Sequence, residues 1–475
     1  MIKRTLKQLA EMAGGTLTGA ADENMLITGV SQDSRTTQPN ELFVPLNIGY
    51  RFDGHDFVQD AFAKGAAASL WQQDRPHPPK DRPLIIVPDT LKALHNMARA
   101  YRQQLSVKVI GVTGSNGKTT TKDMLTSILS KWGKVHYTEG NLNNHVGLPM
   151  TILEADEDAE WMVLEMGMSG RGEIELLSKI ANPDAAVITN IGEAHLLQLG
   201  SRLEIAKAKL EIIAGMKSNG VLIYPGDEPL LRQLFDMEDF EQACGYSCDS
   251  SIERISYGLS EANDHYLQEL KQDPVKEACC FRLNGWSQPL FIPIFGKHNV
   301  LNAAAAAVCM KRLGVSEDAI RQGLIELKIT GMRADVVMLP SGAKVYNQAF
   351  NASPSSVRAS IQALIELEGK GRKIAVLADM LELGADEVKF HREIGAELDP
   401  GQIDEIYTYG ELASHIADAA RERYPHGKVH SFASKQDLTA SLRKSIRKND
   451  MILVKGSRGM KMEEVIEGLL QEEGE

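Results

Sequence analysis

The chain has 475 residues, enough for two to four domains at about 100–200 residues each. Its 43% hydrophobic and 24% charged residues are ordinary for a globular protein, and its formal net charge of −12 argues against nucleic acid or an anionic membrane as partner. The opening MIKRTLKQLAEMAGG lacks a continuous apolar core and the alanine run Ala303 to Val308 is short, so we expect neither a signal peptide nor insertion into a membrane.

The five cysteines are few for this length and odd in number, which is typical of a protein from a reducing cytoplasm. Two of them stand four positions apart, so a zinc site has to be weighed. The spacing contains no paired CxxC motifs and therefore favours ordinary thiols. The cysteines are Cys244, Cys248, Cys279, Cys280 and Cys309.

Residues 1–106 are predicted to form a small mixed α/β domain. Short apolar runs such as ELFVPL and PLIIVPD are typical of strands. Between them, FVQDAFAKGAAASLW predicts an amphipathic helix that is closed by Gly65.

Residues 107–328 differ in pattern, because strongly apolar segments now alternate with helical ones. VKVIGVTG, EWMVLEMG, AAVITNIG and GVLIYPGD predict parallel strands covered by helices on both faces. Residues 236–296 favour an antiparallel excursion, and GKHNVLNAAAAAVCMKRLG predicts a helix that ends at Gly314.

The stretch ITGMRADVV, residues 329–337, predicts a hinge into a third domain over residues 329–475. Its strand-like segments are AKVYNQAF, KIAVLADM, DEIYTYG and DMILVKGS. Polar residues follow these strands, and ligands of doubly wound sheets bind at the carboxyl ends of strands. The chain as a whole is therefore expected to be an α/β protein of three domains.

The stretch GVTGSNGKTTTK, residues 111–122, lies between an apolar strand and a helical pattern and predicts a phosphate-binding loop. It departs from the usual Walker spacing, because Val112 stands where the first glycine is expected. Gly114 and Gly117 would let backbone N–H groups approach phosphates. Lys118 would neutralise the β- and γ-phosphates, and the Thr119 hydroxyl would bind Mg²⁺. A glycine-rich turn with a surface lysine is the weaker alternative.

Two further polar residues lie at predicted strand ends, where a parallel sheet would bring them near this loop. Glu165 closes the strand EWMVLEMG, and His195 follows AAVITNIG. A magnesium–phosphate site commonly takes a carboxylate ligand. Taken singly, Glu165 could cap a helix and His195 could be a hydrogen-bonded loop histidine, but their shared placement favours a site.

Several segments spread over the chain act as a set: GVTGSNGKTTTK, TEGNLNNHVGLPMTIL, LEMGMSGRGEIELL, ITNIGEAHL, AKAKLEI, GKHNVLNAAAA, VLADMLELG and LVKGSRGMKMEEV. Together they resemble the Mur ligases of peptidoglycan synthesis. SQDSRTTQPNELFVPL and FDGHDF also match, so the resemblance covers nearly the whole chain. The first segment alone would indicate only the wider superfamily, which includes folylpolyglutamate synthetases.

The resemblance implies a domain for the UDP moiety, a central parallel-sheet ATPase domain and a Rossmann-like C-terminal domain that closes over the site. It also implies ATP and Mg²⁺ as cofactors and, in the branch that fits best, UDP-N-acetylmuramoyl-tripeptide and D-alanyl-D-alanine as partners. An acyl phosphate of the peptide would be attacked by the dipeptide amine. A cytoplasmic monomer engaged in cell-wall synthesis, and so in cell shape and division, is expected.

Residue roles follow from the same resemblance, position by position. The implied phosphate loop and nucleotide contacts are Gly114, Ser115, Asn116, Gly117, Lys118, Thr119, Thr120, Asn299, Asn302 and Arg333. The implied magnesium ligands are Thr119, Glu165, His195 and Lys209 as a carbamate, and the implied catalytic residues are Lys118, His195 and Lys209. The implied substrate contacts are Ser34, Arg35, Asn141, Asn143, Asn144, Lys455, Ser457 and Arg458. Without the resemblance, Lys209 would be taken for a solvated helix lysine, Asn299 and Asn302 for helix-cap and helix-face residues, and Ser34 and Arg35 for an ordinary loop.

The chain departs from the family pattern in the third domain. Relatives usually have an acid, a tyrosine and a glycine where Gln348, Phe350 and Ala378 stand. These departures put nucleotide contacts from that domain in doubt and keep two alternatives open. One is another ligase of the superfamily, and the other is a catalytically impaired relative that binds nucleotide.

Overall fold

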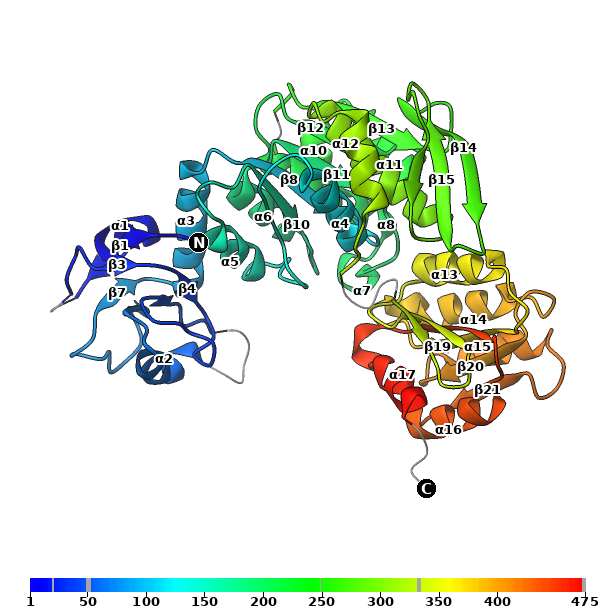
Figure 1. Ribbon diagram of the computed structural model, residues 1–475. Coiled ribbons are helices and arrows are strands. Elements are labelled where there is room, and N and C mark those ends of the chain that lie inside the picture. The colour runs from blue at the N-terminus through cyan, green and yellow to red at the C-terminus, as the bar shows by residue number, and fades with distance from the viewer. Residues whose placement is uncertain (19–20, 48–52, 248, 331–334, 472–475) are drawn as a thin grey trace.

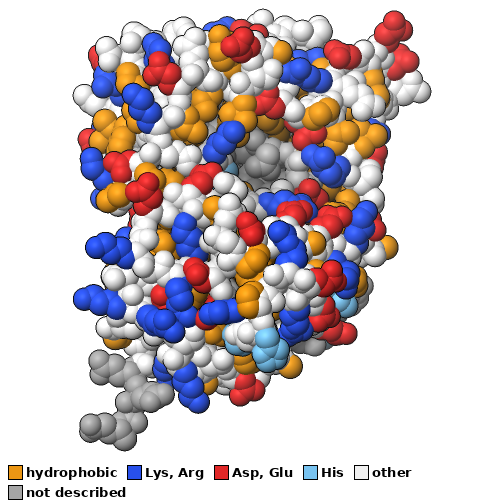
Figure 2. Space-filling view, turned by 90° about the vertical axis from the view of Figure 1, so that its right-hand side faces the viewer, with side chains coloured by type: hydrophobic (Ala, Val, Ile, Leu, Met, Phe, Trp, Pro, Cys, Tyr) orange, Lys and Arg blue, Asp and Glu red, His pale blue; other side chains and the backbone are white. Residues whose placement is uncertain are grey.

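The computed structural model describes residues 1–18, 21–47, 53–247, 249–330 and 335–471. Three domains follow one another along a curved molecule, with the N-terminal and C-terminal domains at its two ends (Figure 1). The predicted three-domain α/β class is confirmed. In the described part of the chain, no helix is both long and apolar enough to cross a membrane. On the face in Figure 2, basic and acidic side chains are interspersed.

The N-terminal domain contains a five-stranded sheet in the order β2–β7–β6–β5–β4, in which β2 alone runs antiparallel to its neighbour. A separate pair joins β1 to β3. As predicted, the second helix ends at Gly65, whose φ of 110° is a left-handed conformation. The elements are β1 (Arg4–Thr5), α1 (Leu6–Ala13), β2 (Thr16–Leu17), β3 (Leu26–Ile27), β4 (Val30–Ser31), β5 (Leu42–Phe43), η1 (Gly54–Phe57), α2 (Val58–Lys64), β6 (Ala68–Gln72), β7 (Leu84–Val87) and α3 (Thr90–Gln104).

The central domain contains a nine-stranded sheet in the order β16–β15–β14–β13–β12–β11–β8–β10–β9. Strands β8 to β13 are parallel, whereas β14, β15 and β16 form an antiparallel meander. The predicted antiparallel excursion is therefore confirmed for its second half only, because β13 still pairs in parallel with β12. The strands are β8 (Lys108–Thr113), β9 (Val135–Tyr137), β10 (Trp161–Glu165), β11 (Ala185–Ile188), β12 (Val221–Pro225), β13 (Glu253–Gly258), β14 (His265–Asp273), β15 (Ala278–Leu283) and β16 (Leu290–Ile292).

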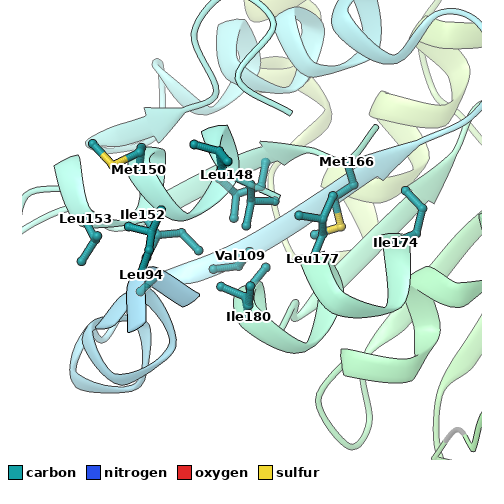
Figure 3. Packing of buried hydrophobic residues seen from close by; sticks show 14 of the residues in the cluster. Leu94, Val109, Leu148, Met150, Ile152, Leu153, Met166, Ile174, Leu177 and Ile180 are labelled. Atoms are coloured by element: carbon teal, nitrogen blue, oxygen red, sulfur yellow. The ribbon is translucent and has the colours of Figure 1, made fainter. Parts of the chain in front are cut away.

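Helices cover both faces of this sheet. They are α4 (Lys118–Leu129), α5 (Gly147–Glu154), α6 (Glu173–Ala181), α7 (Leu196–Leu199), α8 (Arg202–Leu210), η2 (Glu211–Gly215), α9 (Pro229–Phe235), α10 (Phe240–Cys244), α11 (Lys297–Arg312) and α12 (Glu317–Ile325). On one face Val109 of β8 packs among residues of α5 and α6, such as Ile152 and Ile180 (Figure 3). On the other face Ile110 and Val112 pack against α4 and α11. The central strand β8 is thus buried on both sides.

The C-terminal domain contains a six-stranded sheet in the order β17–β18–β22–β19–β20–β21, parallel except for β17. Apolar clusters lie on both of its faces. The elements are β17 (Asp335–Met338), β18 (Lys344–Gln348), α13 (Pro354–Glu366), β19 (Lys373–Ala378), η3 (Gly384–Asp386), α14 (Glu387–Glu397), β20 (Glu405–Tyr409), α15 (Ser414–Arg421), β21 (Val429–Phe432), α16 (Lys435–Ser445), β22 (Met451–Lys455), η4 (Arg458–Met460) and α17 (Glu463–Leu470).

Candidate active site

The predicted phosphate loop joins β8 to the N-terminus of α4. Gly117 precedes the helix with a φ of 78°, and Gly114 has a φ of 144°. A Cβ atom at Gly114 would lie 1.9 Å from Thr189 Oγ1, and one at Gly117 would lie 2.5 Å from Asn302 Oδ1. Both positions therefore require glycine for space as well as for backbone conformation. Lys118 folds back over the loop, with its Nζ 2.9 Å from the Gly114 carbonyl oxygen.

Two residues that follow β11 fix the loop through hydrogen bonds. Asn190 accepts a hydrogen bond from the Asn116 N–H at 2.9 Å through its side chain, and its carbonyl accepts one from the Ser115 N–H at 3.0 Å. Thr189 donates through its hydroxyl to the Asn116 carbonyl at 2.5 Å. Sequence reasoning singled out His195 in this segment and missed Thr189 and Asn190. Their position directly after a strand that neighbours β8 is the signal by which the sequence could have identified them.

Thr119, Glu165 and Asn143 form a cluster beside the loop, in which Thr119 and Glu165 are buried. The Thr119 hydroxyl donates to Glu165 Oε2 at 2.6 Å, and the Asn143 amide donates to Glu165 Oε1 at 2.7 Å. Glu165 is only 1% exposed, so these partners take the place of water as its hydrogen-bond donors. A hydroxyl and a carboxylate at the head of a phosphate loop are oxygen ligands of the kind that Mg²⁺ prefers. The residues present therefore fit a magnesium ion.

Lys209, near the C-terminus of α8, is 1% exposed. Burial lowers its pKa well below the usual range, and the nearby positive charge of Lys118 lowers it further, against the opposing effects of Glu211, Glu173 and Glu165. Within the described residues, its ammonium makes no hydrogen bond or ion pair. Burial and the charge of Lys118 both favour the neutral amine over the ammonium ion.

His195 lies at the contact between the central and C-terminal domains. Its φ of 66° is unusual for a residue with a side chain, and so is the φ of 63° at Glu382. The two residues pair across the domain boundary, with 2.9 Å between His195 Nδ1 and Glu382 Oε2, and the Leu197 N–H donates to the Glu382 carbonyl at 3.0 Å. Burial, followed by the charge of Lys209, lowers the pKa of His195, while Glu382 raises it. Sequence reasoning missed Glu382.

A cavity of about 360 Å³ opens between the phosphate loop and the C-terminal domain. Its walls include the loop, Asn299, Asn302, Gln348, Phe350 and Lys455. A second cavity of about 480 Å³ adjoins it and shares His298, Asn299, Gln348 and Ser360 with it. Asn116 bridges the domains, because its amide lies 3.3 Å from the hydroxyls of both Ser353 and Ser355.

The remaining predicted residues are distributed more widely. Ser34 and Arg35 follow β4, where the exposed Arg35 binds Asp33 at 2.6 Å and holds the pKa of that carboxyl at about 2. Asn141 is exposed in the same loop as Asn143, whereas the Asn144 side chain accepts the backbone N–H groups of Val146 and Gly147 at the start of α5.

After β22, Lys455 donates to the Asn351 carbonyl at 3.0 Å and reaches the smaller cavity. Ser457 is buried and accepts the Leu381 N–H at 2.8 Å, and Arg458 pairs with Glu463 at 2.7 Å. The structure thus brings Lys455 to the phosphate loop and uses Ser457 inside the domain. Arg333 and Cys248 lie outside the described residues.

Known proteins resemble the chain along its whole length. Residues 26–102, 112–310 and 332–458 match the Mur ligase family catalytic domain, the Mur ligase middle domain and the Mur ligase glutamate ligase domain. The UDP-N-acetylmuramoyl-tripeptide–D-alanyl-D-alanine ligase of Bacillus subtilis is 49% identical over 471 residues, which cover 99% of each chain.

Solved structures agree with the sequence comparison. A MurF structure from Acinetobacter baumannii has a TM-score of 0.88 and 31% identity, and the match covers 99% of this chain and 100% of that one. The MurF ligase of Thermotoga maritima in complex with ADP has a TM-score of 0.79 and 30% identity, over 93% and 96% of the two chains. The chain belongs to the Mur ligase family.

Proposed function

We propose that this protein joins D-alanyl-D-alanine to UDP-N-acetylmuramoyl-tripeptide with ATP, through an acyl phosphate, and so completes the pentapeptide precursor of peptidoglycan. The observation that carries the proposal is the convergence of the phosphate loop, the Thr119–Glu165 pair and Lys209 at one edge of the central sheet. The names of the relatives support this choice of substrates. We place the reaction in the cytoplasm of a cell that needs it for shape and division.

The chemistry asks for positioning and charge neutralisation. A carboxylate is a poor electrophile, and phosphorylation converts one of its oxygens into a leaving group that an amine can displace. The backbone N–H groups of the loop and Lys118 would hold the transferred phosphoryl group and offset its charge. The cavity between the domains would shield the acyl phosphate from water, which would otherwise hydrolyse it.

Thr119 and Glu165 would hold a magnesium ion, which when bound would screen the phosphate charges. Lys209 supplies a further group, since a neutral amine reacts with CO₂ to give a carbamate and a proton. The carbamate would offer anionic oxygens next to the phosphate loop. His195, which pairs with Glu382, would be the remaining group around the magnesium ion.

The substrate contacts are also part of the proposal. Ser34 and Arg35 would bind the uridine nucleotide. Asn141, Asn143 and Asn144 would bind the substrate. Lys455 and Arg458 would face the incoming dipeptide. We assign these roles to domains that span residues 1–106, 107–328 and 329–475, in a protein that acts as a monomer.

The experiment is a ligation assay that scores phosphate release and product mass. We expect release only when ATP, Mg²⁺, UDP-N-acetylmuramoyl-tripeptide and D-alanyl-D-alanine are all present, and none from Lys118→Ala. Turnover of UDP-N-acetylmuramoyl-dipeptide with the amino acid that forms the third peptide residue would instead favour another ligase of the superfamily. Turnover of folate with glutamate would do the same. ATP binding without turnover on any of these would show an impaired relative, the possibility that Gln348 and Phe350 raise.

A further inference from the structure

Helix α4 carries two charged residues side by side in the interior of the protein. Lys122 is 0% exposed and Asp123 is 5% exposed, and 2.7 Å separates Lys122 Nζ from Asp123 Oδ1. Taking two charges out of water costs free energy that their attraction does not reliably return, so such a pair is a weak source of stability. Its hydrogen-bond partners show what else it does.

On one side, Asp123 binds Thr330, at the start of the proposed C-terminal domain. Its carboxylate accepts the Thr330 backbone N–H at 2.8 Å and the Thr330 hydroxyl at 2.9 Å. Asp335, the first residue of β17, is five residues further on and therefore within about 17 Å of this anchor. The hydrogen bonds to Thr330 thus limit how far β17 of the C-terminal domain can lie from α4.

On the other side, Lys122 is linked through Thr138 to the backbone of Glu165, the residue whose carboxylate lies in the candidate magnesium site. Its Nζ donates to the Thr138 carbonyl at 3.1 Å and lies 5.1 Å from the centre of the Tyr137 ring. The Thr138 hydroxyl in turn accepts the Glu165 backbone N–H at 3.0 Å. One continuous set of polar contacts therefore joins Thr330 to Glu165.

We propose that Lys122 and Asp123 are positioning residues that set the C-terminal domain against the phosphate loop and fix Glu165 in the same step. The smaller cavity has walls from both domains, so its width depends on how the two domains are positioned relative to each other. The inference rests on the proposed ligation, because it assigns the pair to the catalytic step of that reaction. The pair touches none of the reacting groups and acts through Thr330 and Thr138.

The test compares Thr330→Val and Asp123→Asn with Thr126→Val. Thr330 is exposed, so its valine variant keeps the core intact. Thr126 lies on the same helix, and its hydroxyl has no hydrogen-bond partner among the described residues, which makes it a matched control. Each variant is assayed for kcat, KM for ATP and Tm, and its radius of gyration is measured by X-ray scattering without ligands.

We expect Thr330→Val to lower kcat about tenfold and Asp123→Asn to lower it about a hundredfold, with KM for ATP within about threefold of the parent. Thr330→Val should keep the Tm of the parent and increase the radius of gyration, and Thr126→Val should change nothing. Should kcat of both variants stay within about twofold of the control, or fall only in step with Tm, the proposal is wrong.

Two complications leave the test decisive. If Asp123→Asn does not fold, Thr330→Val alone decides, since it removes one hydroxyl from an exposed residue. If the parent itself releases no phosphate with both substrates, the proposed function fails. The scattering comparison of Thr330→Val with Thr126→Val then still shows whether the pair registers the domains, and an unchanged radius would overturn that.

Discussion

The central domain contains two lysines that are almost completely buried, and they differ in their partners. Lys122 lies 2.7 Å from the carboxylate of Asp123, and its Nζ also donates to the Thr138 carbonyl. Lys209 has no such partner among the described residues, and burial together with the charge of Lys118 lowers its pKa. The difference teaches that burial alone does not assign a role. A paired lysine fixes its neighbours, whereas burial and a nearby cation favour the neutral, nucleophilic form of an unpaired one.

The largest effect that separates the two lysines is on stability. Lys122→Met should lower the free energy of unfolding by about 3–5 kcal/mol, because it leaves the Asp123 carboxylate buried without its cation. Lys209→Met should change it by less than about 1.5 kcal/mol, since an apolar chain of similar volume replaces a neutral amine. Urea unfolding of both variants measures the contrast. Equal losses would mean that the two lysines do not differ as described.

The second effect is on activity and concerns Lys209. Lys209→Ala should lower kcat about 10²–10³-fold, the cost of removing one group that stabilises charge in a transition state. Short carboxylic acids should restore part of the rate by supplying the carboxylate that a carbamate would provide. Steady-state assays with and without acetate or formate measure this. A fully active alanine variant would exclude the carbamate.

A third prediction concerns His298, which lines both cavities and, like Lys209, is a basic side chain whose pKa burial lowers. Burial lowers the pKa of His298 from 6.5 to about 4, and the charge of Lys455 adds to the shift. Between pH 6.5 and 4 the unfolded chain therefore binds a proton on this histidine that the folded chain does not bind. The contribution of His298 to the stability of the fold is full above pH 6.5 and is lost as the pH falls towards 4.

Between pH 7.5 and 4.5 the parent should lose about 2 kcal/mol more than His298→Gln, which does not titrate. Denaturant unfolding at both pH values checks the difference. Parallel losses would show that the histidine titrates as it does in the unfolded chain.

The smallest expected effect is at Gln348, which neighbours Lys455 in the paired strands β18 and β22. Its Oε1 accepts a hydrogen bond from the Ser360 hydroxyl. An aspartate would place a carboxylate beside Lys455 and bind nucleotide groups about 1 kcal/mol more strongly, since charged hydrogen bonds exceed neutral ones by about that amount. Gln348→Asp should therefore lower KM for ATP tenfold or less, with KM for D-alanyl-D-alanine unchanged. An inert parent that the aspartate restores by orders of magnitude would contradict this.

Much of the site could be predicted because it depends on local sequence and on sheet order. Gly114, Gly117 and Lys118 lie between a strand and a helix, as their spacing indicates. Glu165 closes β10, which neighbours β8 in the sheet, so its carboxylate necessarily comes to the loop. The class of the fold follows from the same alternation of apolar strands and helices.

Other features depend on packing that no local pattern contains. Glu382 reaches His195 from another domain, far along the chain. Lys122 and Asp123 look like a solvated helix face, but they are buried, with Lys122 against Tyr137 and Thr138 and Asp123 against Thr330. The role of Asn144 in substrate binding stays a prediction; its side chain accepts the N–H groups of Val146 and Gly147 just before α5.

Helix α11 contacts α4 and carries five consecutive buried alanines, residues 303–307. Alanine is small enough for the helices to approach closely, and this closeness seats Asn302 against Gly117. A larger side chain in the run would push Asn302 away, and a Cβ atom at Gly117 would strike it. An inhibitor that contacts Asn302 and Gly117 would therefore meet a surface with few routes to drug resistance, because the single mutations that alter it also damage the phosphate loop.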